Sequence, residues 1–199
     1  MNRITKVIAF LLVLALLVTS AIVAFAADTK GVNELPRADD ASGSTTGVPD
    51  YALQTIAGSE LRLSGLRGKP VLLDFFSATC QHCQAHAPFV ADLARRHKNL
   101  TVINLAANNP FVESEKVEAY RRDAKIENTI VYAPSELFAL YLTPDENGVI
   151  GVPQAVLFDS SGKLVARFTK WQDTDKPNIE ATIAKHLKQE PEVRSQKPE

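Results

Sequence analysis

The chain has 199 residues, 45% of them hydrophobic and 23% charged, which is the composition of a globular protein. This length suits one domain of ordinary size with extensions, and it is enough to bury a real core. The formal net charge of −1 gives no basis for binding nucleic acid or an acidic partner.

The first 27 residues have the pattern of a targeting segment. Arg3 and Lys6 precede an apolar run over residues 7–25, and Ala24-Phe25-Ala26 resembles a signal-peptidase site. The apolar run is also close to the length of a helix that spans a bilayer. A cleaved signal peptide and an N-terminal membrane anchor over residues 1–27 therefore both remain open. In either case the basic flank stays inside, and the rest of the chain is expected outside the cytoplasm.

Composition divides the remainder of the chain into a linker, a domain and a tail. Residues 28–47 lack apolar periodicity and contain turn-forming residues, which predicts a flexible linker. Residues 48–190 form the predicted domain, and the polar segment 191–199 is predicted to be disordered. The domain opens with two short alternating segments, Tyr51–Thr55 and Glu60–Leu63, which predict a β-hairpin.

The central stretch of the domain is Val71–Pro88. It begins with VLLDFF, a run typical of a strand buried on both faces. Cys80 follows shortly after, then Gln81, His82 and Cys83, and beyond them apolar residues recur at helical spacing. A dithiol is therefore predicted where a buried strand leads into a helix. Unpaired N–H groups and the helix dipole at such a position favour a thiolate.

Both cysteines of the chain lie in this motif. Exported proteins often use cysteines as structural crosslinks, but here the only intrachain disulfide possible joins Cys80 to Cys83. A thiolate at Cys80 can attack a disulfide, and Cys83 can then resolve the mixed disulfide that forms. A structural pair or half of a metal site is the alternative interpretation.

The VLLDFF run, the helix after the cysteines and a second buried-type strand follow in a β-helix-β order, which predicts that the two strands are parallel and joined by a right-handed crossover. Further elements are predicted after the cysteine motif. They are, in sequence, a strand at Thr101–Leu105, a helix within 112–124, a short strand at Ile130–Tyr132, a short helix capped by Ser135, a hairpin of Ala155–Asp159 and Leu164–Phe168, and a C-terminal helix that starts near Pro177.

Several separate positions make the chain resemble the thioredoxin superfamily. Asp74 lies six residues before Cys80, Pro88 lies five residues after Cys83, and Gly151-Val152-Pro153 resembles the cis-proline loop of that superfamily. The segment LSGLRGKPVLLDFF resembles its extracytoplasmic TlpA/ResA-like branch. The resemblance implies an α/β thioredoxin-like fold, in which helices flank a central mixed sheet. It also implies an N-terminal β-hairpin and an insertion before the cis-proline loop.

The resemblance also implies roles for individual residues. Asp74 would move the proton of Cys83, although a hydrogen-bonded structural acid is an open alternative. Val152, beside a cis Pro153, would offer its backbone N–H and C=O to an extended polypeptide across from Cys80.

Two departures from the superfamily pattern stand beside the cysteines. Phe76 and Thr79 replace the usual tryptophans, and His82 replaces the proline that is commonest in the TlpA branch. An imidazole next to a thiolate stabilises the reduced form and makes the pair a stronger oxidant. Gln81 and His82 are therefore expected to tune the redox pair, and the direction of electron flow stays open.

A metal-binding alternative comes from four residues of the motif. Cys80, His82, Cys83 and His86 together offer soft ligands for zinc or copper. His86 is expected instead on the solvated face of the helix, and Trp171 is expected to serve packing.

The sequence thus predicts an extracytoplasmic thiol–disulfide oxidoreductase that exchanges electrons with protein cysteines and needs no metal or organic cofactor. By family analogy its work is cytochrome c maturation or reduction of a copper-site protein, with electrons supplied by a membrane partner. The rival hypotheses are a disulfide-forming oxidant tuned by His82 and a copper- or zinc-binding metallochaperone.

Overall fold

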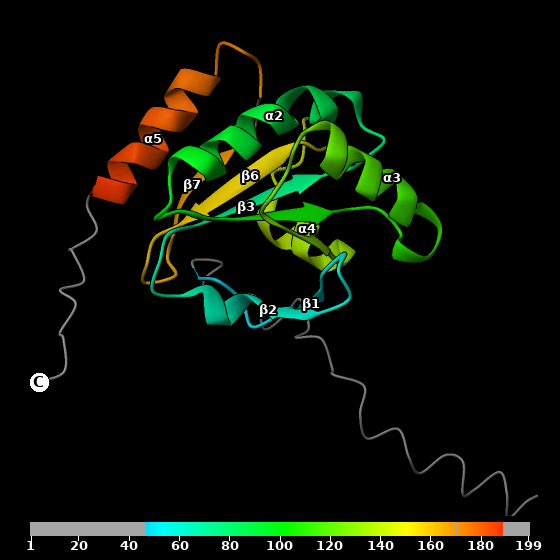
Figure 1. Ribbon diagram of the computed structural model, residues 1–199. Helices are drawn as coiled ribbons and strands as arrows, with labels where there is room; N and C mark the ends of the chain where they lie inside the picture. Colours follow the sequence, from blue (N-terminus) through cyan, green and yellow to red (C-terminus); the bar gives the residue numbers. More distant parts are fainter. Residues whose placement is uncertain (1–46, 170, 189–199) are drawn as a thin grey trace, which may run out of the picture. The chain divides into compact units, whose positions relative to one another are not determined.

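A computed structural model describes residues 47–169 and 171–188 (Figure 1). The expectations for residues 1–27, for the linker up to residue 46 and for the tail 191–199 lie outside the described residues. Within the part that is described, no helix is both long and apolar enough to cross a membrane.

The centre of the described domain is a mixed sheet of five strands in the order β5-β4-β3-β6-β7. The strands are β3 (Val71–Phe76), β4 (Thr101–Ala106), β5 (Thr129–Tyr132), β6 (Gln154–Phe158) and β7 (Leu164–Phe168). β3 runs parallel to β4 and antiparallel to β6, and β6 and β7 form the predicted hairpin. All six residues of β3 are buried, as expected for the central strand.

Helices cover both faces of this sheet (Figure 1). On one face lie α2 (Gln81–Arg96), α3 (Pro110–Asp123) and α5 (Lys176–Lys188), and on the other lie α4 (Ser135–Tyr141) and the hairpin of β1 (Ala52–Gln54) and β2 (Glu60–Arg62). Side chains alternate along a strand. Leu73 and Phe75 therefore pack against α4 and the hairpin, whereas Leu72 and Phe76 pack beneath the helices of the first face. Asp74, between them in β3, belongs to the same face as α2.

Local capping explains where the two helices beside the cysteines begin. Cys80 has extended backbone angles and is the N-cap of α2, and its sulfur accepts a hydrogen bond from the N–H of Cys83 at 3.3 Å. Asn109 caps α3 by accepting from the N–H of Phe111 at 2.9 Å. The carboxylate of Glu113, one turn into the helix, accepts from the N–H of Asn109 at 3.1 Å.

The prediction that Ser135 caps α4 is wrong. Pro134 holds the N-cap position and makes no side-chain cap bond. Ser135 is already the first helical residue, and its hydroxyl contacts the carboxylate of Glu136 at 3.3 Å instead of a backbone N–H.

Candidate active site

The dithiol lies at the end of β3, where the chain enters α2. Cys80 is half-buried at the N-cap, while Cys83, one turn further, is completely buried. Both cysteines are free thiols in this structure. The sulfur of Cys80 also lies 3.5 Å from the carbonyl oxygen of Val152, to which the thiol donates. One sulfur therefore faces the surface and the other faces the core.

The surroundings of Cys83 disfavour its thiolate. Burial raises the pKa of the Cys83 thiol well above its ordinary value, and the hydrogen bond with Cys80 and the negative charge of Asp74 raise it further. Tyr120 of α3 stacks on Phe76, and its hydroxyl donates to the carbonyl oxygen of Cys83 at 3.1 Å. Cys83 is thus held as a neutral thiol until its surroundings change.

We expect the two thiols to differ sharply in reactivity. In the reduced, folded protein at neutral pH, iodoacetamide should modify Cys80 and leave Cys83 unmodified until the chain is unfolded, because the thiolate is the reacting form. Peptide mass spectrometry after a short pulse measures both sites. Modification of Cys83 at a rate similar to that of Cys80 would contradict the burial of this thiol.

The raised pKa of Cys83 also makes the free energy of unfolding depend on pH. The unfolded thiol ionises near its ordinary pKa of about 8.5, while the folded thiol keeps its proton. Its contribution to stability is therefore complete below that pH and is lost as the pH rises, by up to about 1.4 kcal/mol per pH unit. Urea unfolding of the reduced protein between pH 7 and about 10 should show this loss relative to Cys83→Ser.

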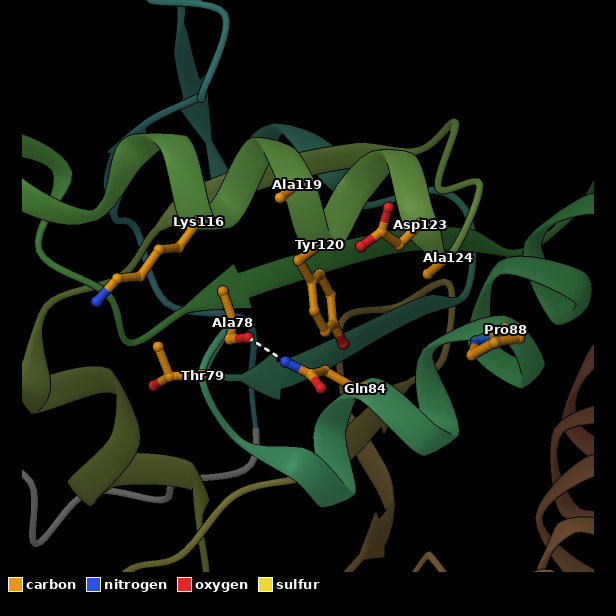
Figure 2. A pocket seen from close by; sticks show the side chains of 9 residues that line it. All are labelled: Ala78, Thr79, Gln84, Pro88, Lys116, Ala119, Tyr120, Asp123 and Ala124. Atoms are coloured by element: carbon orange, nitrogen blue, oxygen red, sulfur yellow. Dashed lines mark hydrogen bonds between the residues drawn. The ribbon is translucent and has the colours of Figure 1, made fainter.

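Hydrogen bonds between two side chains and the backbone of Ala78 hold the loop that carries Cys80. The N–H of Ala78 donates to the side chain of Asn108 at 2.8 Å, and the side-chain amide of Gln84 donates to the carbonyl of Ala78 at 2.8 Å. Figure 2 shows Gln84 reaching back to Ala78, with Tyr120 extending from α3 toward the same region. These residues line a pocket of about 560 Å³ between α2 and α3, beside the exposed Thr79.

The loop opposite Cys80 contains a cis peptide bond between Val152 and Pro153, as the sequence predicts. This loop, the exposed His82 and Trp171 line a second surface pocket of about 480 Å³. Gln81 is also exposed, at the first position of α2. The residues expected to tune the redox pair thus lie at the surface, on the side of Cys80.

One buried side chain holds this loop in place. The amide of Gln154, the residue after Pro153, accepts from the N–H of Thr143 and donates to the carbonyls of Thr143 and Gly151, each at 2.9 Å. Gln154 therefore ties both ends of the segment 143–151 to the start of β6. No sequence motif pointed to Gln154, because its partners are set by the folded loop.

Asp74 lies beneath α2 and is fully buried. One carboxylate oxygen contacts His86 Nε2 at 3.1 Å, and the other accepts from the side-chain amide of Asn104 at 2.7 Å. Asn104 is the register partner of Asp74 on β4, and its own oxygen accepts from Asn128. The acid expected to serve Cys83 is therefore part of a buried polar network.

The expectation that His86 lies on a solvated face is wrong. Its side chain is 1% exposed, and its ring packs 4.7 Å from that of Trp171, which does serve packing as expected. His86 follows Cys83 by three positions (i to i+3), so both lie on the buried face of α2. That spacing was the signal available in the sequence. Within the described ranges, no group of three or more His, Cys, Asp or Glu side chains is arranged to hold a metal ion.

Comparison with known proteins agrees with this architecture. The model of the AhpC/TSA family matches residues 45–167, more than half of the chain. The chain belongs to the AhpC/TSA family. Its fold is thioredoxin-like, as expected: a solution structure named as a putative protein disulfide isomerase from Bacteroides thetaiotaomicron superimposes with a TM-score of 0.61 at 26% identity. That superposition covers 72% of this chain and 89% of the other.

Curated relatives of this family member carry the name thiol-disulfide oxidoreductase ResA. The protein from Geobacillus kaustophilus is 38% identical over 78 residues, which are 38% of this chain and 44% of that protein. The protein from Geobacillus thermodenitrificans is 30% identical over 127 residues, 62% of this chain and 67% of that protein. The match thus spans less than half of the first relative and two thirds of the second.

Proposed function

We propose that this protein is an extracytoplasmic thiol–disulfide oxidoreductase that exchanges electrons with the cysteines of other proteins. The observation that carries the proposal is the asymmetry of the pair: a half-buried sulfur at the N-terminus of a helix, with a buried thiol one turn behind it. The ResA name of its relatives supports the same activity. The apolar N-terminal run and the A-x-A pattern support a location outside the cytoplasm.

Reduction of a substrate disulfide would follow two sulfur exchanges. The Cys80 thiolate attacks one sulfur of the substrate disulfide, whose bond breaks and releases the other as a thiolate. Cys83 then loses its proton to Asp74, and its thiolate attacks Cys80. The Cys80–substrate bond breaks, the Cys80–Cys83 disulfide forms, and the substrate leaves with two electrons and takes up protons from solvent. Oxidation of a substrate dithiol is the same sequence reversed.

The groove beside Cys80 suits an extended polypeptide. The loop of Val152 and Pro153 lies across from Cys80, and Val149 and Ile150 in the same loop are exposed apolar side chains. We assign the backbone of Val152 to hydrogen bonding with the substrate chain, in the manner of an added β-strand. The substrates would be protein thiols or disulfides, by analogy those of cytochrome c maturation or of a copper-site protein. A membrane partner would then supply the electrons.

A second candidate is a disulfide-forming oxidant. The exposed imidazole of His82 between the two cysteines favours it, since an imidazole that hydrogen-bonds the Cys80 thiolate stabilises the reduced pair. The two candidates share the chemistry and differ in the direction of electron flow.

The reduction potential of the Cys80–Cys83 pair tests both candidates. We expect the full chain, equilibrated in glutathione and dithiothreitol buffers, to show one reversible two-electron couple. A reduction potential of about −270 mV indicates a reductant, and one of about −120 mV indicates an oxidant. His82→Pro should lower the potential, by roughly 30 mV for each tenfold loss of thiolate stabilisation. Absence of any reversible couple would overturn the proposed function.

A further inference from the structure

His86 is a buried titratable residue to which the exchange chemistry above gives no task. Its side chain is 1% exposed, and among the described residues the ring's only hydrogen-bond partner is the carboxylate of Asp74, which is 0% exposed. Burying two ionisable groups costs free energy unless they are paired. This pair joins α2, the helix that carries both cysteines, to the central strand β3.

The hydrogen-bond geometry assigns the proton between the two groups. The other ring nitrogen of His86, Nδ1, is buried without a protein partner in the described part of the chain. A proton on Nδ1 would be an orphaned donor, so the neutral ring carries its proton on Nε2 and donates it to Asp74. Asn104 donates to the other carboxylate oxygen. Asp74 is thus an acceptor fixed by two donors.

The negative charge of Asp74 acts on the thiol of Cys83, the resolving cysteine. Cys83 and His86 lie one turn apart on the buried face of α2, and Asp74 is among the groups that raise the pKa of Cys83, after burial and the Cys80 hydrogen bond. With His86 neutral the pair bears one negative charge, which opposes a thiolate at Cys83. When the pair has gained a proton it is neutral and no longer opposes it.

We propose that His86 is a positioning residue for Asp74, and that the two act as one coupled acid–base pair that takes the proton of Cys83 in the resolving step. The inference rests on the proposed function and deepens it. The S–H bond of Cys83 breaks and its proton passes to the Asp74 carboxylate, while His86 Nε2–H keeps its bond to that group. The Cys83 thiolate then attacks Cys80 and displaces the substrate thiolate.

Few other charged groups face the pair. From α2 this is the thiol of Cys83, and from α3 it is Tyr120, whose pKa is raised by burial and by the charge of Asp74. The segment before α5 brings the uncharged ring of Trp171. Lys176 of α5 lies over the ring of Phe89 and is paired with Asp173. The pH response of the resolving step is therefore expected to come from the pair and from Cys83.

The test separates the two exchanges in time. The reduced full chain is mixed with a chromogenic aromatic disulfide. The first released thiolate reports attack by Cys80, and the second reports resolution by Cys83. We expect His86→Gln, which keeps an amide donor but cannot titrate, to slow the second phase about tenfold and to remove one inflection from its pH profile. The first phase should stay within about twofold of wild type. His97→Gln, the same change at the end of α2, is the matched control.

Each outcome decides the proposal. An unchanged second phase in His86→Gln overturns it, and so does a slower phase with the wild-type pH profile, which would indicate a structural role only. Asp74→Asn should slow the second phase as well, and the double variant should be no slower than the slower single variant. Wild-type protein that releases no thiolate at all would overturn the proposed function itself.

A measurement on the unsubstituted protein covers the case in which His86→Gln does not fold. Ring-nitrogen NMR of the wild-type chain should show a pH dependence of the His86 signals that changes when the Cys80–Cys83 disulfide is reduced. The His97 signals serve as the internal control. Identical His86 curves in the oxidised and reduced protein overturn the coupling.

Discussion

Replacing Cys80 by Ser should abolish disulfide exchange, with a loss of about a thousandfold or more in the rate of substrate reduction. Cys83 cannot take over the attack, because it is fully buried and its raised pKa keeps it protonated. Serine is close to cysteine in size, so the N-cap of α2 should persist. Stopped-flow measurement with a chromogenic disulfide and with a reducible protein substrate checks the loss.

Replacing Cys83 by Ser should have the opposite signature. The first exchange at Cys80 should proceed at nearly the wild-type rate, and the reaction should then stop at a stable mixed disulfide because no resolving thiol remains. Intact-protein mass spectrometry detects one substrate molecule attached to each chain. The Cys80→Ser variant is the control, and a mixed disulfide on Cys83 in that variant would contradict the assignment of the attacking sulfur.

Local patterns were sufficient to predict the order of the main elements. The VLLDFF run is the central strand β3, and the cysteines do lie where that strand leads into α2. The hairpin of β6 and β7 lies at the sheet edge as expected. These predictions succeeded because burial on two faces, alternation and helical spacing are visible within a dozen residues.

Side-chain environments set by distant segments were not predictable in the same way. A histidine on an amphipathic helix is usually solvated, but the register of β3 and β4 places Asp74 and Asn104 side by side under α2, where His86 bonds to Asp74. The prediction that Ser135 caps α4 failed for a local reason, because α4 begins one residue earlier than expected and Pro134 holds the N-cap position. The pairing of distant strands therefore determines which side chains surround the cysteines, whereas the local sequence pattern is enough to place the cysteines at the start of α2.

Gln154→Ala should impair reaction with protein substrates. It removes three hydrogen bonds and releases the segment 143–151 from the start of β6. Loss of these bonds should lower stability by about 1–3 kcal/mol. A displacement of Val152 by about 1 Å should slow exchange with a protein substrate by up to about a hundredfold, since the substrate backbone would no longer be aligned with Cys80.

The readout that isolates alignment is the contrast between large and small reactants. Alkylation of Cys80 by iodoacetamide in Gln154→Ala should stay within about twofold of wild type, because a small reagent needs no alignment by the loop. Gln172→Ala is the matched control, as Gln172 lines the same pocket but is exposed and makes none of these three bonds. An equal loss toward both reactants would show that the substitution had disturbed Cys80 itself. Protein exchange as fast as in the Gln172→Ala control would show that the loop keeps its place without Gln154.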